Sequence, residues 1–330
     1  MTNRDLGVFE GPNALMNFLD PDHHPPLPLV ELPDHLNPFR HLRVRILAKA
    51  MYLLPLLNLK SLPALSMLRH AKEAGNLAGV STVVESSSGN TAVSLAVLAR
   101  AFGIQRTTAL VPWDIAPGKL DLLRLCGAEP RLHRDSPDAT ANEQARLTGD
   151  EPGHFSPGQY YNDANPAAFE RWVAPELWKQ ANGKLTVFAT GLGSTGTLVG
   201  ASRFFRRQQQ KVAMIGAICK PNEAVPGVRS ELRLQEIEHD WRAAADHIVE
   251  VATKPSFKYS LELCRTGIMG GPSSGFALAG LLQFLQVRAE SSALDELRNA
   301  AGEVYAVFIC GDTPLPYLDK YSTHLDASDF

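Results

Sequence analysis

Apolar residues follow two alternating patterns along most of the chain. Short runs rich in β-branched residues predict buried strands, and longer stretches with apolar residues every three or four positions predict helices. The predicted strands cover 80–85, 107–112, 129–133, 185–190, 212–219 and 304–310, and the helices 91–103, 117–127, 167–183, 198–210 and 273–289. Strands that alternate with helices predict an α/β fold with mostly parallel twisted sheets, wound as two lobes. The charged stretch 231–247 is typical of a solvated helix, with a mobile surface segment as the alternative, and residues 1–40 form a polar, Pro-rich lead-in.

Composition and charge exclude several classes of protein. The chain has 330 residues, 45% of them hydrophobic and 20% charged, with a formal net charge of −3 and no block of like charges. We therefore expect a globular protein that binds no nucleic acid. The first residues lack the pattern of a secretory signal, and no apolar run reaches the ~18 residues that span a bilayer, so we expect a cytoplasmic protein without membrane contact.

Neither a metal site nor a disulfide framework is expected. The four cysteines, Cys126, Cys219, Cys264 and Cys310, lie far apart and form no CxxC pair. His23 and His24 lie in a Pro-rich loop without a third ligand in register.

The glycine-rich segment TGLGSTGTLVG, residues 190–200, follows a predicted strand and opens a predicted helix. Glycines let the backbone approach an anion, and the free N–H groups of a helix start favour negative charge. The segment therefore predicts a phosphate-binding loop, although an ordinary tight turn would have a similar composition. Its spacing matches neither a Walker A loop nor the strict dinucleotide fingerprint.

A second loop, ESSSGNTAVSLA at residues 85–96, also runs from strand to helix. Its hydroxyls and N–H groups suit the carboxylate of an amino acid. The alternative is that one serine caps the helix.

Lys60 stands in the apolar segment LLPLLNLKSLPALSML at the start of a predicted helix. Burial among leucines should lower the pKa of its amine and make it available for Schiff base formation. A lysine extended toward solvent is the alternative.

Together with three further segments, these motifs resemble the cysteine synthase and cystathionine β-synthase family, the fold type II enzymes that use pyridoxal phosphate. The resemblance runs from about residue 26 to residue 320 and rests on motifs in the family's order. They are PPLPLVEL (25–32), Lys60, ESSSGNT (85–91), QYYNDANP (159–166), GLGSTGT (191–197) and GGPSSG (270–275).

The resemblance implies a role for each matching residue. Lys60 would carry the cofactor as a Schiff base and move the α-proton, Asn90 would bind the phenolic oxygen, and Ser273 would meet the ring nitrogen. The substrate carboxylate would be held by Ser87, Ser88, Thr91 and Gln159, and the cofactor phosphate by Gly193, Ser194, Thr195, Gly196 and Thr197. It also implies a larger cofactor-binding lobe of residues 1–51 and 161–330, a smaller mobile substrate-binding lobe of residues 52–160, and a homodimer.

The function implied is β-replacement on an activated serine through an aminoacrylate. O-acetylserine or O-phosphoserine would be the donor, and sulfide, thiosulfate, a thiol or an amine the nucleophile. A serine hydroxyl at the ring nitrogen makes a weaker electron sink than a carboxylate, which suits departure of a β-leaving group. Two alternatives remain open: a β-elimination lyase, and a non-catalytic regulatory homologue.

Several positions depart from the family pattern. The usual Gly-Ser before the lysine and Asp-Arg after it are missing, Thr195 replaces a glycine, and Phe169 replaces a common histidine. Arg229, in a segment that lacks the usual glycines, could serve an anionic co-substrate or lie at the surface. These departures concern the substrate more than the cofactor.

Overall fold

The computed structural model describes residues 7–134 and 140–330, which divide into two compact units. Of these described residues, unit 1 contains 7–25, 60–134 and 140–165, and unit 2 contains 26–59 and 166–330. Each unit has its own parallel or mostly parallel sheet flanked by helices, so the prediction of an α/β fold with two wound sheets is confirmed.

Unit 1 is built on a four-stranded parallel sheet in the order β5-β4-β3-β6. Its strands are β3 (Thr82–Ser86), β4 (Arg106–Pro112), β5 (Ala128–His133) and β6 (His154–Phe155). Its helices are α1 (Ala14–Leu19), α2 (Ser61–Glu73), α3 (Asn90–Ala101), α4 (Pro117–Leu125) and α5 (Ala141–Gly149).

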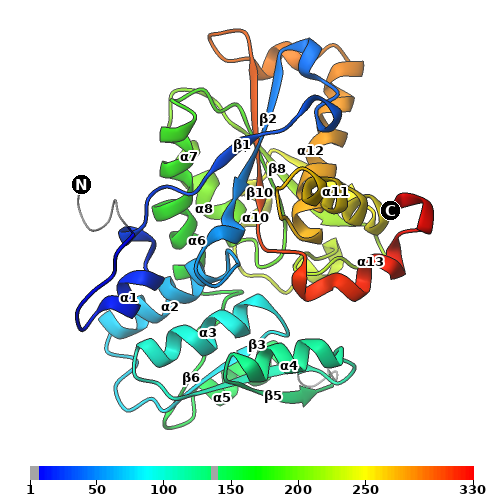
Figure 1. Cartoon of the computed structure of the whole chain (residues 1–330). Coiled ribbons are helices and arrows are strands. Elements are labelled where there is room, and N and C mark those ends of the chain that lie inside the picture. The colour runs from blue at the N-terminus through cyan, green and yellow to red at the C-terminus, as the bar shows by residue number, and fades with distance from the viewer. Residues whose placement is uncertain (1–6, 135–139) are drawn as a thin grey trace. The chain divides into compact units, whose positions relative to one another are not determined.

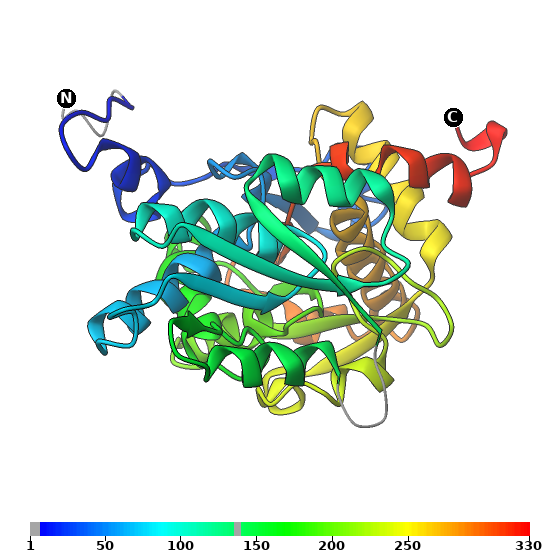
Figure 2. The same ribbon diagram turned by 90° about the horizontal axis from the view of Figure 1, so that it is seen from below.

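Helices cover both faces of this sheet. Ala109 and Val111 of β4 pack in one cluster with α3 and α4, whereas Leu110, which points the opposite way, packs with Ala145 of α5. Figure 2 shows the strands of this unit between α4 and α5. Residues 83–84 of β3 and 109–111 of β4 are apolar and buried, which is why the sequence pattern reveals these two strands, whereas β5 and β6 are largely half-buried or exposed.

Unit 2 has a six-stranded sheet in the order β1-β2-β10-β7-β8-β9, in which only the β1–β2 pair is antiparallel among the described strands. Its strands are β1 (Leu29–Glu31), β2 (Val44–Ala50), β7 (Val187–Gly191), β8 (Ala213–Cys219), β9 (His247–Val251) and β10 (Val304–Cys310). Its helices include α7 (Ala174–Gln180), α8 (Gly196–Phe205), α11 (Thr253–Arg265), α12 (Pro272–Glu290) and α13 (Leu318–His324). Helix α6 (Ala164–Ala168) crosses the division between the units.

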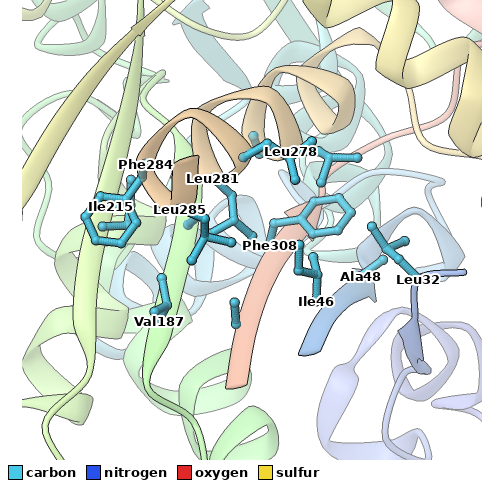
Figure 3. Packing of buried hydrophobic residues seen from close by; sticks show 14 of the residues in the cluster. Leu32, Ile46, Ala48, Val187, Ile215, Leu278, Leu281, Phe284, Leu285 and Phe308 are labelled. Carbon is cyan, nitrogen blue, oxygen red and sulfur yellow. The ribbon is translucent and has the colours of Figure 1, made fainter. Parts of the chain in front are cut away.

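Helix α12 forms the centre of the unit 2 core. It lies along the sheet in Figure 1, and Figure 3 shows its apolar side chains directed toward those of the strands. The residues labelled there on α12 are Leu278, Leu281, Phe284 and Leu285. Every residue of β10 is buried, and the strand lies between β2 and β7 in the sheet. The residues that follow its carboxyl end therefore start from a well-packed part of unit 2.

The predicted strands and helices are found with small shifts of their ends, and two predictions are wrong. The single helix expected over 167–183 is instead α6, one turn of π-helix at Phe169–Val173, and α7. The solvated helix expected over 231–247 is two short turns, α9 (Glu231–Leu234) and α10 (Trp241–Ala244), because Leu234 and Trp241 are buried. In residues 7–134 and 140–330, no helix is long and apolar enough to cross a bilayer.

Candidate active site

Three loops of unit 2 lie at one edge of its sheet. Strands β2, β10 and β7 are adjacent and parallel, so their carboxyl ends lie at the same edge. The segment to Leu59 follows β2, Gly311 and Asp312 follow β10, and the glycine-rich loop follows β7. Ligands of open α/β sheets bind at this edge.

The glycine-rich loop contains a buried hydroxyl that the rest of the described protein leaves without a partner. Ser194, Thr195 and Thr197 are all buried, and the Oγ1 atom of Thr195 accepts and donates no hydrogen bond among the described residues. Leaving such a group unpaired costs about 1–3 kcal/mol, so it indicates a missing polar ligand. The loop leads directly into α8, whose first N–H groups favour an anion. These features fit a phosphate group.

Thr195 also has a left-handed backbone, with φ of 64° and ψ of −11°. A β-branched residue rarely adopts positive φ, because its Cβ crowds the backbone. Strained residues of this kind cluster at ligand sites and cost on the order of 1–3 kcal/mol. Glycine has no Cβ, so it would adopt this backbone conformation without strain.

Close backbone contacts bring the glycine-rich loop near the turn that contains Ser273. A Cβ built on Gly193 would lie 2.3 Å from the carbonyl oxygen of Gly227, so only glycine fits there. A Cβ built on Gly227 would in turn lie 4.0 Å from the Cβ of Ser273. The predicted phosphate loop and the residue predicted to meet the ring nitrogen are thus neighbours within one unit.

Ser273 donates a hydrogen bond from its Oγ to Oδ1 of Asp312, at 3.2 Å. Asp312 is 4% exposed, and its Oδ2 accepts a second hydrogen bond of 2.7 Å from the hydroxyl of Tyr317. The carboxylate therefore lies behind Ser273 and is fixed by two hydroxyl groups.

The segment that leads to Lys60 pairs with the same edge. The N–H of Leu59 donates to the carbonyl oxygen of Gly311 at 2.8 Å, and Asn58 forms an antiparallel bridge with Asp312. Lys60 is the next residue and the N-cap of α2, which agrees with its predicted place at a helix start, and it is partly buried.

Unit 1 holds the residues predicted to bind the substrate carboxylate. Strands β3 and β6 are parallel neighbours, so the serine-rich loop after β3 and Gln159 after β6 leave the same sheet edge. The hydroxyl of Thr91 donates to Oε1 of Gln159 at 2.9 Å, and the Oγ of Ser87 accepts from the N–H of Gly89 at 3.3 Å. Helix α3 begins at Asn90, immediately after Ser88 and Gly89.

A buried carboxyl lies beneath this pair. Glu85 is 2% exposed, its Oε1 accepts from Nε2 of Gln159 at 3.3 Å, and its Oε2 accepts from the N–H of Gly158 at 3.1 Å. Burial raises the pKa of Glu85 to about 7, and the hydrogen bond from Gln159 opposes that rise. The charge of Glu85, which contacts Gln159, therefore changes near neutral pH.

The sequence profile of the pyridoxal-phosphate dependent enzyme family matches residues 21–294. The chain belongs to this family. Among curated members, cysteine synthase B of Escherichia coli (strain K12) is 31% identical over 232 residues, which cover 68% of this chain and 75% of the relative. Cystathionine beta-synthase of Mus musculus is 29% identical over 256 residues, 72% of this chain and 46% of the relative.

A solved structure of the same fold is that of O-ureido-L-serine synthase. Its TM-score is 0.76 at 23% identity, and the match covers 91% of this chain and 93% of that one. At this identity the likeness shows the fold, which is the fold type II architecture of the family.

Two departures from the family pattern have structural explanations. Phe169 is completely buried and begins the π-helical turn, so it packs in the core of unit 2. Arg229 is partly buried, with a side chain 18% exposed, and it pairs with Glu236 at 3.2 Å. Its charge is therefore partly neutralised.

Two residues of the site were missed by sequence reasoning. Glu85 lies next to the end of the largely apolar strand β3, and Asp312 lies two residues after β10. A carboxylate in such an apolar place is the signal that could have revealed them. Glu85 bonds with Gln159, 74 residues away along the chain, and Asp312 with Ser273, 39 residues away. A local sequence pattern cannot predict pairs so far apart.

Proposed function

We propose that this member of the family binds pyridoxal phosphate covalently on Lys60 and catalyses β-replacement on an activated serine. The observation that carries the proposal is the convergence, at one sheet edge, of the unpaired Thr195 hydroxyl, Ser273 and the segment ending at Leu59. When bound, the cofactor supplies an aldehyde for the lysine amine and an electron-withdrawing ring.

We propose a role for each of the predicted site residues. The phosphate is held by Gly193, Ser194, Thr195, Gly196 and Thr197, the ring nitrogen by Ser273, and the phenolic oxygen by Asn90. Ser87, Ser88, Thr91 and Gln159 hold the substrate carboxylate within the smaller substrate-binding lobe, residues 52–160. The amine of Lys60, once free, takes the α-proton of the substrate.

The substrate class follows from the relatives and from Gln159. Cysteine synthase B is a curated relative, and in this chain Gln159 is already oriented by Thr91 and Glu85. We propose O-acetylserine or O-phosphoserine as donor, with sulfide, thiosulfate, a thiol or an amine as nucleophile. We also propose a cytoplasmic homodimer, which light scattering would reveal as twice the chain's mass.

Cofactor binding is tested by reconstitution of the wild type, of Lys60→Ala and of Lys72→Ala, an exposed lysine of the same helix. The wild type and Lys72→Ala should show a visible absorption band that shifts when an amino acid is added. Lys60→Ala should show neither. An unchanged band and full turnover in Lys60→Ala would refute the assignment, and no band in any of the three would favour a non-catalytic homologue.

The reaction is tested by a screen of O-acetylserine, O-phosphoserine, serine, cysteine and threonine. β-Replacement requires a new amino acid only when a nucleophile is supplied. Pyruvate or another 2-oxo acid formed without a nucleophile would instead identify a β-elimination lyase.

A further inference from the structure

The side-chain amide of Gln159 is held at both ends within unit 1. Its Oε1 accepts from the hydroxyl of Thr91 at 2.9 Å, and its Nε2 donates to Oε1 of Glu85 at 3.3 Å. An ionised Glu85 has only acceptor oxygens, so it binds the N–H end of the amide, which is the orientation observed. The Thr91 hydroxyl then donates its proton within the protein rather than to a ligand.

A protonated Glu85 favours the opposite end of the amide. The N–H of Gly158 donates to Oε2 of Glu85 at 3.1 Å, so a proton is better placed on Oε1, the oxygen that faces Gln159. An O–H group needs an acceptor, and Gln159 supplies one when its amide turns over and presents its own Oε1. The hydroxyl proton of Thr91 and an N–H group of Gln159 are then available to an anion.

The side chains around Glu85 are mainly uncharged. Ala109 is its partner on β4, and Ala109 packs with Ala92 and Ala96 of α3. Burial is the largest effect on the pKa of Glu85 and raises it to about 7, whereas hydrogen bonds lower it. Burial also raises the pKa of Tyr161, a titratable neighbour, and Glu85 raises it further, so Tyr161 is neutral near pH 7.

Two charged groups act on Tyr161 with opposite signs. The guanidinium of Arg146 on α5 lies 5.2 Å from the centre of the Tyr161 ring and lowers the pKa of Tyr161, whereas Asp150 raises it. Neither group is among the main causes of the pKa of Glu85. A negative charge brought to Gln159 would therefore act on a carboxyl that is balanced between its two forms at neutral pH.

A substrate carboxylate held by Gln159 and Thr91 would act on Glu85 in two ways. It would repel an ionised Glu85, since Gln159 contacts both carboxyl groups. It would also accept from the donors that become available when Glu85 is protonated. Charge and hydrogen bonding therefore favour the same form of Glu85, the neutral one.

We propose that Glu85 is a positioning residue for the substrate carboxylate: protonation of Glu85 turns the Gln159 amide toward the ligand, so an amino acid binds together with one proton from solvent. This inference rests on the proposed function and deepens its carboxylate-binding site. Affinity should be highest below about pH 7 and fall as Glu85 ionises. A bound carboxylate that raises the pKa of Glu85 by about one unit makes this fall about tenfold.

The test is a titration of the holoenzyme with L-alanine, followed by the shift of its visible absorption band between about pH 6 and pH 8.5. L-Alanine has the α-amino and carboxylate groups of the substrate but no β-leaving group, so it binds without elimination. Glu85→Gln does not ionise, and its amide can donate to Gln159 and accept from Gly158, as the protonated acid does. Relative to the wild type, this variant should bind L-alanine equally well at low pH and about tenfold more tightly at high pH.

Two controls isolate the coupling. Glu151→Gln, an exposed position of unit 1, should bind L-alanine as the wild type does at every pH. L-Alaninamide lacks the negative charge, so the ratio of its affinities for Glu85→Gln and the wild type should not change with pH. Equal pH dependence in Glu85→Gln and the wild type would overturn the proposal, as would an effect of Glu85 that is the same for L-alanine and its amide.

If Glu85→Gln does not fold, infrared difference spectroscopy of the wild type provides the independent measurement. A buried carboxyl absorbs at different frequencies when protonated and when ionised, so adding L-alanine at about pH 7.5 should increase the first signal and decrease the second. No such change would overturn the proposal. A wild type whose visible band is absent or does not respond to any amino acid would instead overturn the proposed function, a failure seen before Glu85 is examined.

Discussion

Glu85→Gln should remove the loss of stability that ionisation of Glu85 causes in unit 1 as the pH rises. The pKa of Glu85 rises from 4.5 to about 7 on burial, so near pH 6 the folded state keeps a proton that the unfolded chain has lost. The folded state then binds more protons, and its stability falls as the pH rises through about 7. One pKa unit corresponds to about 1.4 kcal/mol, so the loss is at most about 3 kcal/mol.

Glutamine is close in shape to the protonated acid and does not ionise. It can still accept from the N–H of Gly158, so at about pH 5 the variant should be about as stable as the wild type. Its advantage should then grow to about 2–3 kcal/mol at about pH 8. The exposed Glu151, changed to Gln, is the control in the same unit and should show no such trend.

Urea unfolding followed by circular dichroism at a series of pH values measures this difference. A gap between Glu85→Gln and the wild type that stays within about 0.5 kcal/mol over the whole range would refute the reasoning. So would a variant that becomes less stable as the pH rises.

Two further substitutions test the loop and the packing around it. Thr195→Gly should stabilise the cofactor-free protein by about 1 kcal/mol in urea unfolding, because it removes both the left-handed strain and the unpaired hydroxyl. The same variant should bind pyridoxal phosphate about tenfold more weakly in a titration, since it lacks that hydroxyl. A destabilised variant would contradict this reasoning. Gly200→Ala should cost about 3 kcal/mol in the same assay, since its Cβ would lie 2.0 Å from the carbonyl oxygen of Pro166. Gly118→Ala, where a Cβ meets nothing within 4 Å, should be neutral or slightly stabilising, and equal effects at the two glycines would show that this packing does not matter.

The sequence predicts those parts of the fold in which local pattern and tertiary environment agree. Strand β10 was predicted with its observed ends, because all its residues are buried and apolar. Strand β2 was missed, since Arg45 and Lys49 interrupt its apolar pattern; yet Lys49 is fully buried and pairs with Glu176 and Gln180. A distant partner overrides the local signal there.

The same distinction holds for the site. The loops were predictable because glycines and hydroxyls between a strand and a helix have a local physical meaning. The left-handed backbone of Thr195 and the hydrogen bond from Ser273 to Asp312 were not, since each depends on contacts that only the folded chain creates.

The central claim is tested most directly by finding which lysine carries the cofactor. The protein is incubated with pyridoxal phosphate, reduced with borohydride so that the bond to the lysine becomes permanent, and digested for peptide mass spectrometry. The account predicts one phosphopyridoxyl group per chain, on the peptide containing Lys60. Label spread over surface lysines, or placed on another single lysine while Lys60 stays unmodified, would contradict it.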